Sequence, residues 1–250
     1  MMKYFFLLSL LITTCNVKAF AQEQIPIQTD RPDQTECPFI VPKKYFQIEN
    51  GISFENTDDL SNTFFHPSSL IKYGLTDILE LRLIMELTTV TFEQENVTGI
   101  NPVTVGFKIN LIKENGIVPT TSFIGHLTVP YMATSKFKSE HYEPAFRFTM
   151  QHTLTKRLSF GYNLGMEWEN KMHTFIYTVT NGYSISEKVG AYVELYGFAP
   201  QNEKPDHRFD GGFNYLLNQN VLLDVSGGVG LSSNSPKYYA AFGFSFRFKS

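Results

Sequence analysis

The chain has 250 residues, of which 42% are hydrophobic and 15% aromatic, and its formal net charge at pH 7 is −3. The lack of a basic surplus excludes a nucleic-acid-binding protein, which needs a positively charged face. Beyond its first residues the chain holds no apolar run of about 20 residues, so a helical membrane protein is not expected either. The aromatic residues are mainly 23 Phe and 13 Tyr, and both types favour β-strands.

Residues 1–21 are predicted to be a cleavable export signal. Lys3 supplies a positive start, residues 4–12 form a short apolar run, and Ala19 and Ala21 make a small-x-small site with cleavage after Ala21. The apolar run is too short to span a bilayer as a helix. Two alternatives are a membrane anchor and a lipoprotein signal ending at Cys15.

Cleavage would change the charge and the cysteine content. It removes two of the 21 basic residues and no acidic residue, so 19 basic and 24 acidic residues remain, a formal net charge of −5. Cys37 is then the sole cysteine, which excludes an intrachain disulfide and a cysteine-based zinc site.

Residues 22–43 are predicted to form a separate N-terminal segment, either periplasmic or acting as a plug. Its charged residues are Asp30, Arg31, Asp33 and Glu36. The simpler interpretation is a strap that packs under the following domain, and the alternative is a plug whose charges pair inside that domain. Charge pairing alone does not decide between them.

Residues 44–250 alternate apolar and polar side chains with a period of two, the pattern of β-strands. The last segment is the clearest example: Phe242, Phe244, Phe246 and Phe248 share one face, while small or charged residues such as Arg247 share the other. The alternating segments are about 10 residues long, as a tilted membrane-crossing strand requires. We therefore expect an all-β fold, a closed antiparallel up-and-down transmembrane β-barrel of about 12 strands.

The predicted connections alternate between short turns and longer polar loops, as in outer-membrane barrels. An even strand number places both ends of the barrel on the periplasmic side. The longer loops are expected at residues 56–67, 89–101, 131–143, 169–171, 201–206 and 232–236.

In such a barrel the apolar face meets lipid and the polar face lines the lumen. Charges of both signs can pair across the lumen, which lowers the cost of holding them there. The predicted lumen-lining residues are Glu49, Lys72, Glu80, Arg82, Glu86, Lys108, Arg147, Glu167, Glu194, Arg208, Asp210, Asp224 and Arg247.

A soluble β-sandwich is the competing fold, with the aromatic faces as its core and the charges in water. Alternation alone does not exclude it. Strand length, loop asymmetry and the export signal together favour the membrane barrel.

The opening of the mature chain resembles a known family of exported bacterial proteins. Residues 29–38 read TDRPDQTECP, followed by Val41-Pro42 and the sequence QIENG at residues 47–51. These residues are similar to the opening of the putative MetA-pathway of phenol degradation family, and residues 73–77 are similar to its first turn. The resemblance implies a transporter-like outer-membrane barrel for small hydrophobic or aromatic compounds.

No residue pattern indicates an enzyme, a metal site or a cofactor. None of the six histidines has a metal-ligand spacing such as H-x₃-H. Ser122 and His126 share a strand face, but about 13 Å separates residues four apart on a strand, too far for a hydrogen bond. A membrane-embedded hydrolase is thus the least favoured function.

The sequence leaves two main functions open. The first is a channel or transporter for small solutes, motivated by the charged lumen face. The second is a structural or adhesive barrel that binds partners through the loops at residues 56–67 and 131–143. Both predict an outer-membrane location, outer-membrane lipid and the barrel assembly machinery as partners, and no nucleic acid.

Overall fold

The structure is a computed structural model that describes residues 25–250 except residues 59 and 94. The predicted export signal, residues 1–21, and its cleavage after Ala21 lie outside the described residues. Within the described part of the chain, no helix is long and apolar enough to cross a bilayer. The one helical element found there is the 3-10 turn η1, Ser135–Phe137.

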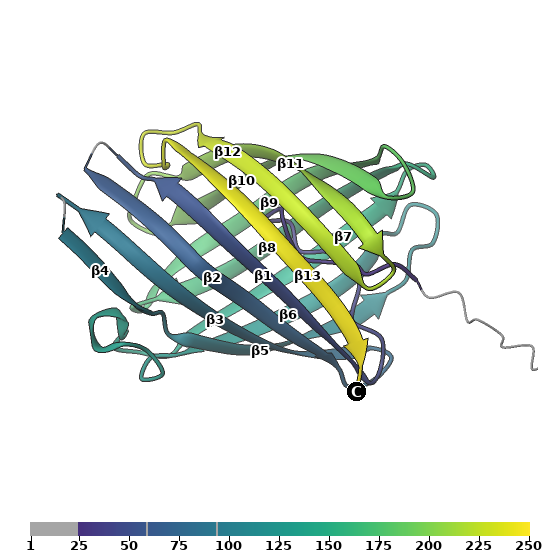
Figure 1. Cartoon of the computed structure of the whole chain (residues 1–250), viewed down its shortest axis with the longest axis horizontal. Helices are drawn as coiled ribbons and strands as arrows, with labels where there is room; N and C mark the ends of the chain where they lie inside the picture. The colour runs from purple at the N-terminus through teal and green to yellow at the C-terminus, as the bar shows by residue number, and fades with distance from the viewer. Residues whose placement is uncertain (1–24, 59, 94) are drawn as a thin grey trace, which may run out of the picture.

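The fold is all-β, as predicted, and its long strands curve into a barrel (Figure 1). Each strand alternates residues between two environments, because successive side chains of a strand point to opposite faces. The strands are β1 Tyr45–Asn56, β2 Ser61–Gly74, β3 Leu79–Phe92, β4 Glu95–Ile100, β5 Val103–Ile112, β6 Thr120–Val129, β7 Glu143–Thr153, β8 Leu158–Glu169, β9 Met172–Ser184, β10 Val189–Pro200, β11 Asp206–Asn218, β12 Val221–Gly230 and β13 Tyr238–Lys249.

The sheet closes on itself. β1 pairs with both β2 and β13, and successive strands pair antiparallel around the ring. β3 pairs with β5 through residues 79–84 and with β4 through residues 87–92, so β4 adds to the wall without belonging to the ring. Twelve strands therefore close the barrel and β4 is an extra one, which confirms the prediction of about 12 strands.

Two predicted loops are wrong because strands extend through them. Residues 89–101 were expected to be a loop, but β3 continues to Phe92 and β4 pairs back along it. Polar residues fit this hairpin because they bond across it, as Thr89 and Thr98 do with their hydroxyl oxygens 2.8 Å apart. Likewise β2 begins at Ser61, inside the loop expected at residues 56–67.

The two rims of the barrel differ. One rim, called here the turn rim, carries the connections at residues 75–78, 113–119, 154–157, 185–188 and 219–220, together with the start of β1 and the end of β13. The opposite loop rim carries the longest connection, residues 130–142. This asymmetry is the one found in bacterial outer-membrane barrels, whose short turns are periplasmic.

The distribution of side chains is inverted relative to a soluble protein. The buried residues are mainly polar or charged, and apolar side chains of the strands are exposed on the outside. Burying one such apolar side chain stabilises by about 1.5–3 kcal/mol, so water is an unfavourable surrounding for this outer face and lipid a favourable one. The soluble sandwich, which would bury its aromatic faces, does not fit. Exposed examples are Leu81, Met85, Val105, Phe107, Phe148, Leu164, Val193, Leu195, Phe213, Val225, Phe242 and Phe244.

Candidate functional site

Residues 25–43, called here the inner segment, run through the inside of the barrel (Figure 1). The segment enters at the turn rim, where the Ile27 N–H donates to the Gln219 carbonyl at 2.9 Å. It crosses the interior and returns to the same rim, where the Val41 N–H donates to the Glu80 carboxylate at 2.8 Å. These contacts lie within the barrel and not beneath it, so the segment does not form the strap that was the simpler expectation.

The carboxylate of Asp30 is the electrostatic centre of the inner segment. It forms ion pairs with Lys72 at 2.9 Å and Lys108 at 2.7 Å. Arg82 lies 3.2 Å from the same carboxylate. All four side chains are almost fully buried. Burial raises the pKa of Asp30, but the three cations outweigh it and hold this pKa well below its usual value.

Glu36 binds the same wall farther along the segment. Its carboxylate lies 2.6 Å from Arg82 and 3.7 Å from Arg147. Its backbone carbonyl accepts hydrogen bonds from the Thr149 hydroxyl and from the Asn163 amide, the latter at 3.1 Å. The segment is thus fixed to this wall by both side-chain charge and backbone polarity.

Arg31 points toward the opposite side of the barrel, where two glycines leave room for its side chain. Gly51 of β1 and Gly243 of β13 are register partners. A Cβ atom on Gly51 would meet the Arg31 guanidinium, and one on Gly243 would meet both the Asp224 carboxylate and the Arg31 Nε atom, at the place where Arg31 and Asp224 pair at 3.1 Å. The absence of side chains at both positions is therefore required by the close approach of Arg31.

The remaining interior wall, on β9 to β13, is acidic. Glu194 accepts hydrogen bonds from the Gln34 N–H at 2.7 Å and from the Thr35 hydroxyl. Asp210 is the register partner of Glu194, and its carboxylate accepts a hydrogen bond from the Tyr239 hydroxyl. Asp33 faces these carboxylates, and its burial together with the Glu194 charge raises the pKa of Asp33 well above its usual value.

Ser122 and His126 do not form a catalytic pair. The Ser122 hydroxyl donates to the Pro38 carbonyl at 2.5 Å, so it holds the inner segment in place. The His126 Nε2 atom has no hydrogen-bond partner among the described residues. Across the described ranges, no group of three or more His, Cys, Asp or Glu residues is arranged to hold a metal ion.

The structure places the predicted lumen residues on the inner face of the wall. Nine of them are buried and the other four are half-buried. The inner segment brings many of them together. Arg208 instead pairs with Glu55 and Asp206 near the loop rim. Arg247 lies at the turn rim, where it donates to the carbonyls of Gln219 and of Ile25, the first residue of the segment. The buried ones are Glu49, Lys72, Glu80, Arg82, Lys108, Glu194, Asp210, Asp224 and Arg247, and the half-buried ones are Glu86, Arg147, Glu167 and Arg208.

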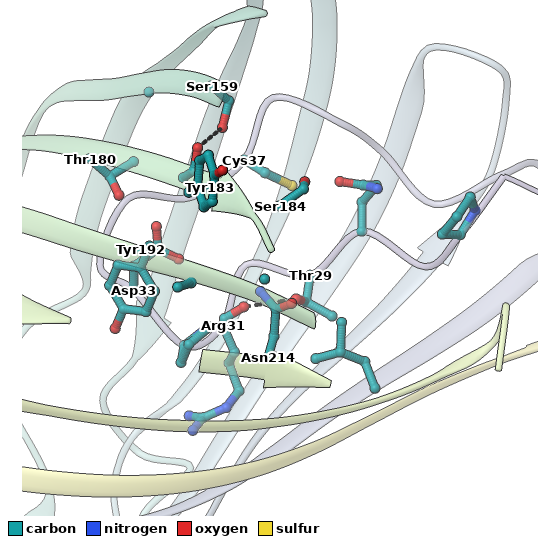
Figure 2. A pocket seen from close by; sticks show the side chains of 18 of the residues that line it. Thr29, Arg31, Asp33, Cys37, Ser159, Thr180, Tyr183, Ser184, Tyr192 and Asn214 are labelled. Atoms are coloured by element: carbon teal, nitrogen blue, oxygen red, sulfur yellow. Dashed lines mark hydrogen bonds between the residues drawn. The ribbon is translucent and has the colours of Figure 1, made fainter. Parts of the chain in front are cut away.

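Two cavities lie beside the inner segment, and Arg31 and Pro32 line both of them. The turn-side cavity, about 340 Å³, is lined largely by hydroxyl, amide and glycine residues, and Figure 2 shows Thr29, Ser159, Thr180 and Ser184 around it, with Asp33 beside Tyr192. The loop-side cavity, about 250 Å³, holds the rings of Phe65, Tyr196 and Tyr239 together with Arg208, Glu55 and Glu86.

Sequence reasoning missed the uncharged members of this interior. Selection for charge omitted Ser122, Thr149, Asn163 and Tyr192, although each lies on the polar face of its alternating strand. The signal that could have found them is the two-residue period itself, read without regard to charge.

Comparisons with known proteins agree with this architecture. The COG4313 outer membrane channel from Pseudomonas putida F1 superposes with a TM-score of 0.70 at 13% identity, covering 87% of this chain and 99% of that chain. The KdgM porin superposes with a TM-score of 0.56 at 13% identity, covering 81% of this chain and 99% of that chain. At these identities the likeness concerns the fold.

The sequence itself carries the family relationship. No match to a curated protein sequence is found. A family model described as "Putative MetA-pathway of phenol degradation" matches residues 29–248, from the inner segment to the last strand. The chain therefore belongs to this family, as its opening residues indicated.

Proposed function

We propose that this protein is an outer-membrane channel for small solutes, and that the inner segment acts as a plug that restricts the lumen. The observation that carries the proposal is a closed, outwardly apolar barrel whose polar interior holds a cavity on each side of residues 31–32. A solute crossing the barrel along its axis would pass both cavities and would have to displace the segment between them. The fold shared with outer-membrane channels supports this reading.

The loop-side cavity supports aromatic solutes in particular. Phe65, Tyr196 and Tyr239 offer three ring surfaces, and Arg208 and Glu86 offer charged groups that orient a polar substituent. A small aromatic molecule with a polar group matches such a lining. The phenol degradation named in the family description points to the same class of compound.

A planar-bilayer and liposome experiment tests the proposal. Purified protein should give small conductance steps. Liposomes that contain it should take up a small aromatic solute such as phenol faster than liposomes without it, and a matched solute too large for the cavities should show no such difference. A barrel that inserts, shown by heat-modifiable migration on a gel, but gives neither conductance nor solute uptake would contradict the proposal.

The loop rim supports a second candidate function, partner binding. Residues 130–142 form its longest connection, and Tyr131, Met132 and Tyr142 are more than half exposed there at 66%, 55% and 57%. Shortening this loop should abolish binding to a partner cell or protein while solute uptake persists. Unchanged adhesion after loop removal would rule this function out.

A further inference from the structure

Four cations on one side of the barrel, from β2 to β7, form one surface of its interior, called here the cationic wall. They are Lys72 of β2, Arg82 of β3, Lys108 of β5 and Arg147 of β7. Lys72, Arg82 and Lys108 are 1% exposed or less at their side chains. Charges buried to this degree are strongly unfavourable unless each has a partner.

The barrel strands alone do not neutralise this wall. Within ion-pair distance, two strand carboxylates face the four cations: Glu49 pairs with Lys72, and Glu80 lies 3.8 Å from Arg82. Glu167 acts on Arg147 at longer range. At ion-pair distance the cations therefore exceed the strand carboxylates by two. Asp30 and Glu36 of the inner segment supply the two negative charges that balance it.

The wall also has hydrogen-bond donors to spare. Arg82 already contacts both Asp30 and Glu36 through Nη2. Its Nε and Nη1 atoms are buried and have no hydrogen-bond partner among the described residues, and Nη1 faces the Glu80 carboxylate at 3.8 Å, beyond hydrogen-bond distance. These two N–H groups form one edge of the guanidinium, the geometry that a carboxylate binds with two hydrogen bonds.

We infer that the cationic wall is a binding site for carboxylate-bearing solutes, and that Asp30 and Glu36 of the inner segment occupy it as internal competitors of such a solute. The inference rests on the proposed channel function and deepens it. A solute carboxylate would replace one of the two segment carboxylates on the wall. Binding of the solute would therefore be coupled to release of the segment from the wall. Glu36 and Cys37 line the turn-side cavity, whereas the four cations do not, so a small anion in that cavity would reach the wall only as the Glu36 carboxylate moves away.

The opposite wall of the barrel interior carries the opposite charge. There Glu194, Asp210 and Asp224 are acidic, and Arg31 is the segment residue that pairs with this wall, through Asp224. The segment therefore presents negative groups to the cationic wall and a positive group to the acidic wall. A carboxylate entering the barrel is attracted to the first wall and repelled by the second.

Calorimetric titration with benzoate tests the inference, with the neutral isostere benzamide as a second probe. The double variant Asp30→Asn, Glu36→Gln keeps the shape of the segment but removes its charge. Because the competing carboxylates are gone, benzoate should bind at least about tenfold more tightly than to the unmodified protein. Benzamide binding should be the same in both proteins.

Two further variants make the test specific. Asp33→Asn changes another acidic residue of the same segment, but one that faces the acidic wall and has a raised pKa, so benzoate affinity should stay unchanged. Adding Arg82→Gln to the double variant should return benzoate affinity to that of the unmodified protein. Heat-modifiable migration shows that each variant is folded.

The inference is overturned if the folded double variant binds benzoate no more tightly than the unmodified protein, or if Asp33→Asn has the same effect. Solute uptake into liposomes separates the two proposals. Normal uptake without a benzoate effect refutes the carboxylate site alone, whereas a benzoate effect without uptake of any solute refutes the channel.

Discussion

Single side chains decide how the inner segment is held. Arg31 reaches Asp224 only because Gly51 and Gly243 leave room on the inner face of two neighbouring strands. The Asp224 side chain is fully buried. Removing one partner of a buried ion pair typically costs about 3–5 kcal/mol, because the other charge is left without compensation.

The substitution Gly243→Ala should loosen the inner segment. The new Cβ would lie 2.2 Å from an Asp224 carboxylate oxygen and 2.6 Å from the Arg31 Nε atom, so the Arg31–Asp224 pair would be displaced. Cys37, a half-buried residue of the same segment, would become more accessible to a thiol reagent. Since each 1.4 kcal/mol corresponds to a factor of ten, we expect labelling to accelerate at least about tenfold.

Gly227→Ala is the matched control, because the nearest atom to its new Cβ is the Tyr239 carbonyl oxygen at 3.3 Å. Cys37→Ser establishes that the label is on this residue. Equal labelling rates for Gly243→Ala and the unmodified protein would show that the glycine gap does not position Arg31.

Glu36 gives the docking of the segment a dependence on pH. Burial raises its pKa, but Arg82 and Arg147 outweigh burial and lower this pKa from 4.5 to about 2. A carboxyl group with a lowered pKa stabilises the docked state above its undocked pKa, and this contribution is lost as the pH falls toward the docked value. Docking should therefore weaken between about pH 4.5 and pH 2.

Pepsin, which is active in this range, can measure the effect. Cleavage of residues 29–43 should become faster as the pH falls from 4.5 to 2, relative to cleavage of an unstructured peptide under the same conditions. In the Glu36→Gln variant this increase should be smaller, because one of the titrating groups is absent. An increase of equal size in both proteins would exclude Glu36 as its source.

At the level of strands, the period-two pattern was sufficient to predict most of the barrel. It located the last strand and its two faces from Phe242, Phe244, Phe246 and Arg247, because strand side chains alternate whatever their partners are. It failed at residues 89–101, where β4 is short and polar and is stabilised by cross-strand pairing with β3. Such pairing depends on the partner strand, which a local pattern does not contain.

The same limit applies to the inner segment. Asp30 lies 42 residues before Lys72 and 78 before Lys108, and its charge alone fits a strap as well as a segment inside the barrel. The charged lumen residues could be selected from the sequence by their alternation. Their partners could not, because the path of the segment through the interior is set by contacts on nearly every strand.

The strand assignment also predicts different outcomes for two deletions, one within β2 and one within the longest loop. Removing residues 61–66 should prevent folding, because they are part of a strand that pairs with both β1 and β3. Replacing residues 132–141 with a short turn should preserve the barrel, because this connection lies outside the ring of strands. Heat-modifiable migration distinguishes the two, and a folded barrel after the first deletion would contradict the strand assignment.

At the scale of the whole molecule, two features combine. The outer face is apolar, and the inner face is charged and filled by a segment whose carboxylates balance the wall. A barrel of twelve strands is wide enough to hold such a segment and still leave cavities on both sides of it. The conductance of the barrel should therefore depend on the segment more than on any single wall residue.

Planar-bilayer conductance of the unmodified protein and of a variant lacking residues 29–38 tests this account most directly. If these residues restrict the lumen, the deletion variant should give conductance steps several times larger than those of the unmodified protein, with both proteins folded by heat-modifiable migration. Steps of equal size, or a silent barrel after the deletion, would show that the lumen is not a solute path restricted by the inner segment.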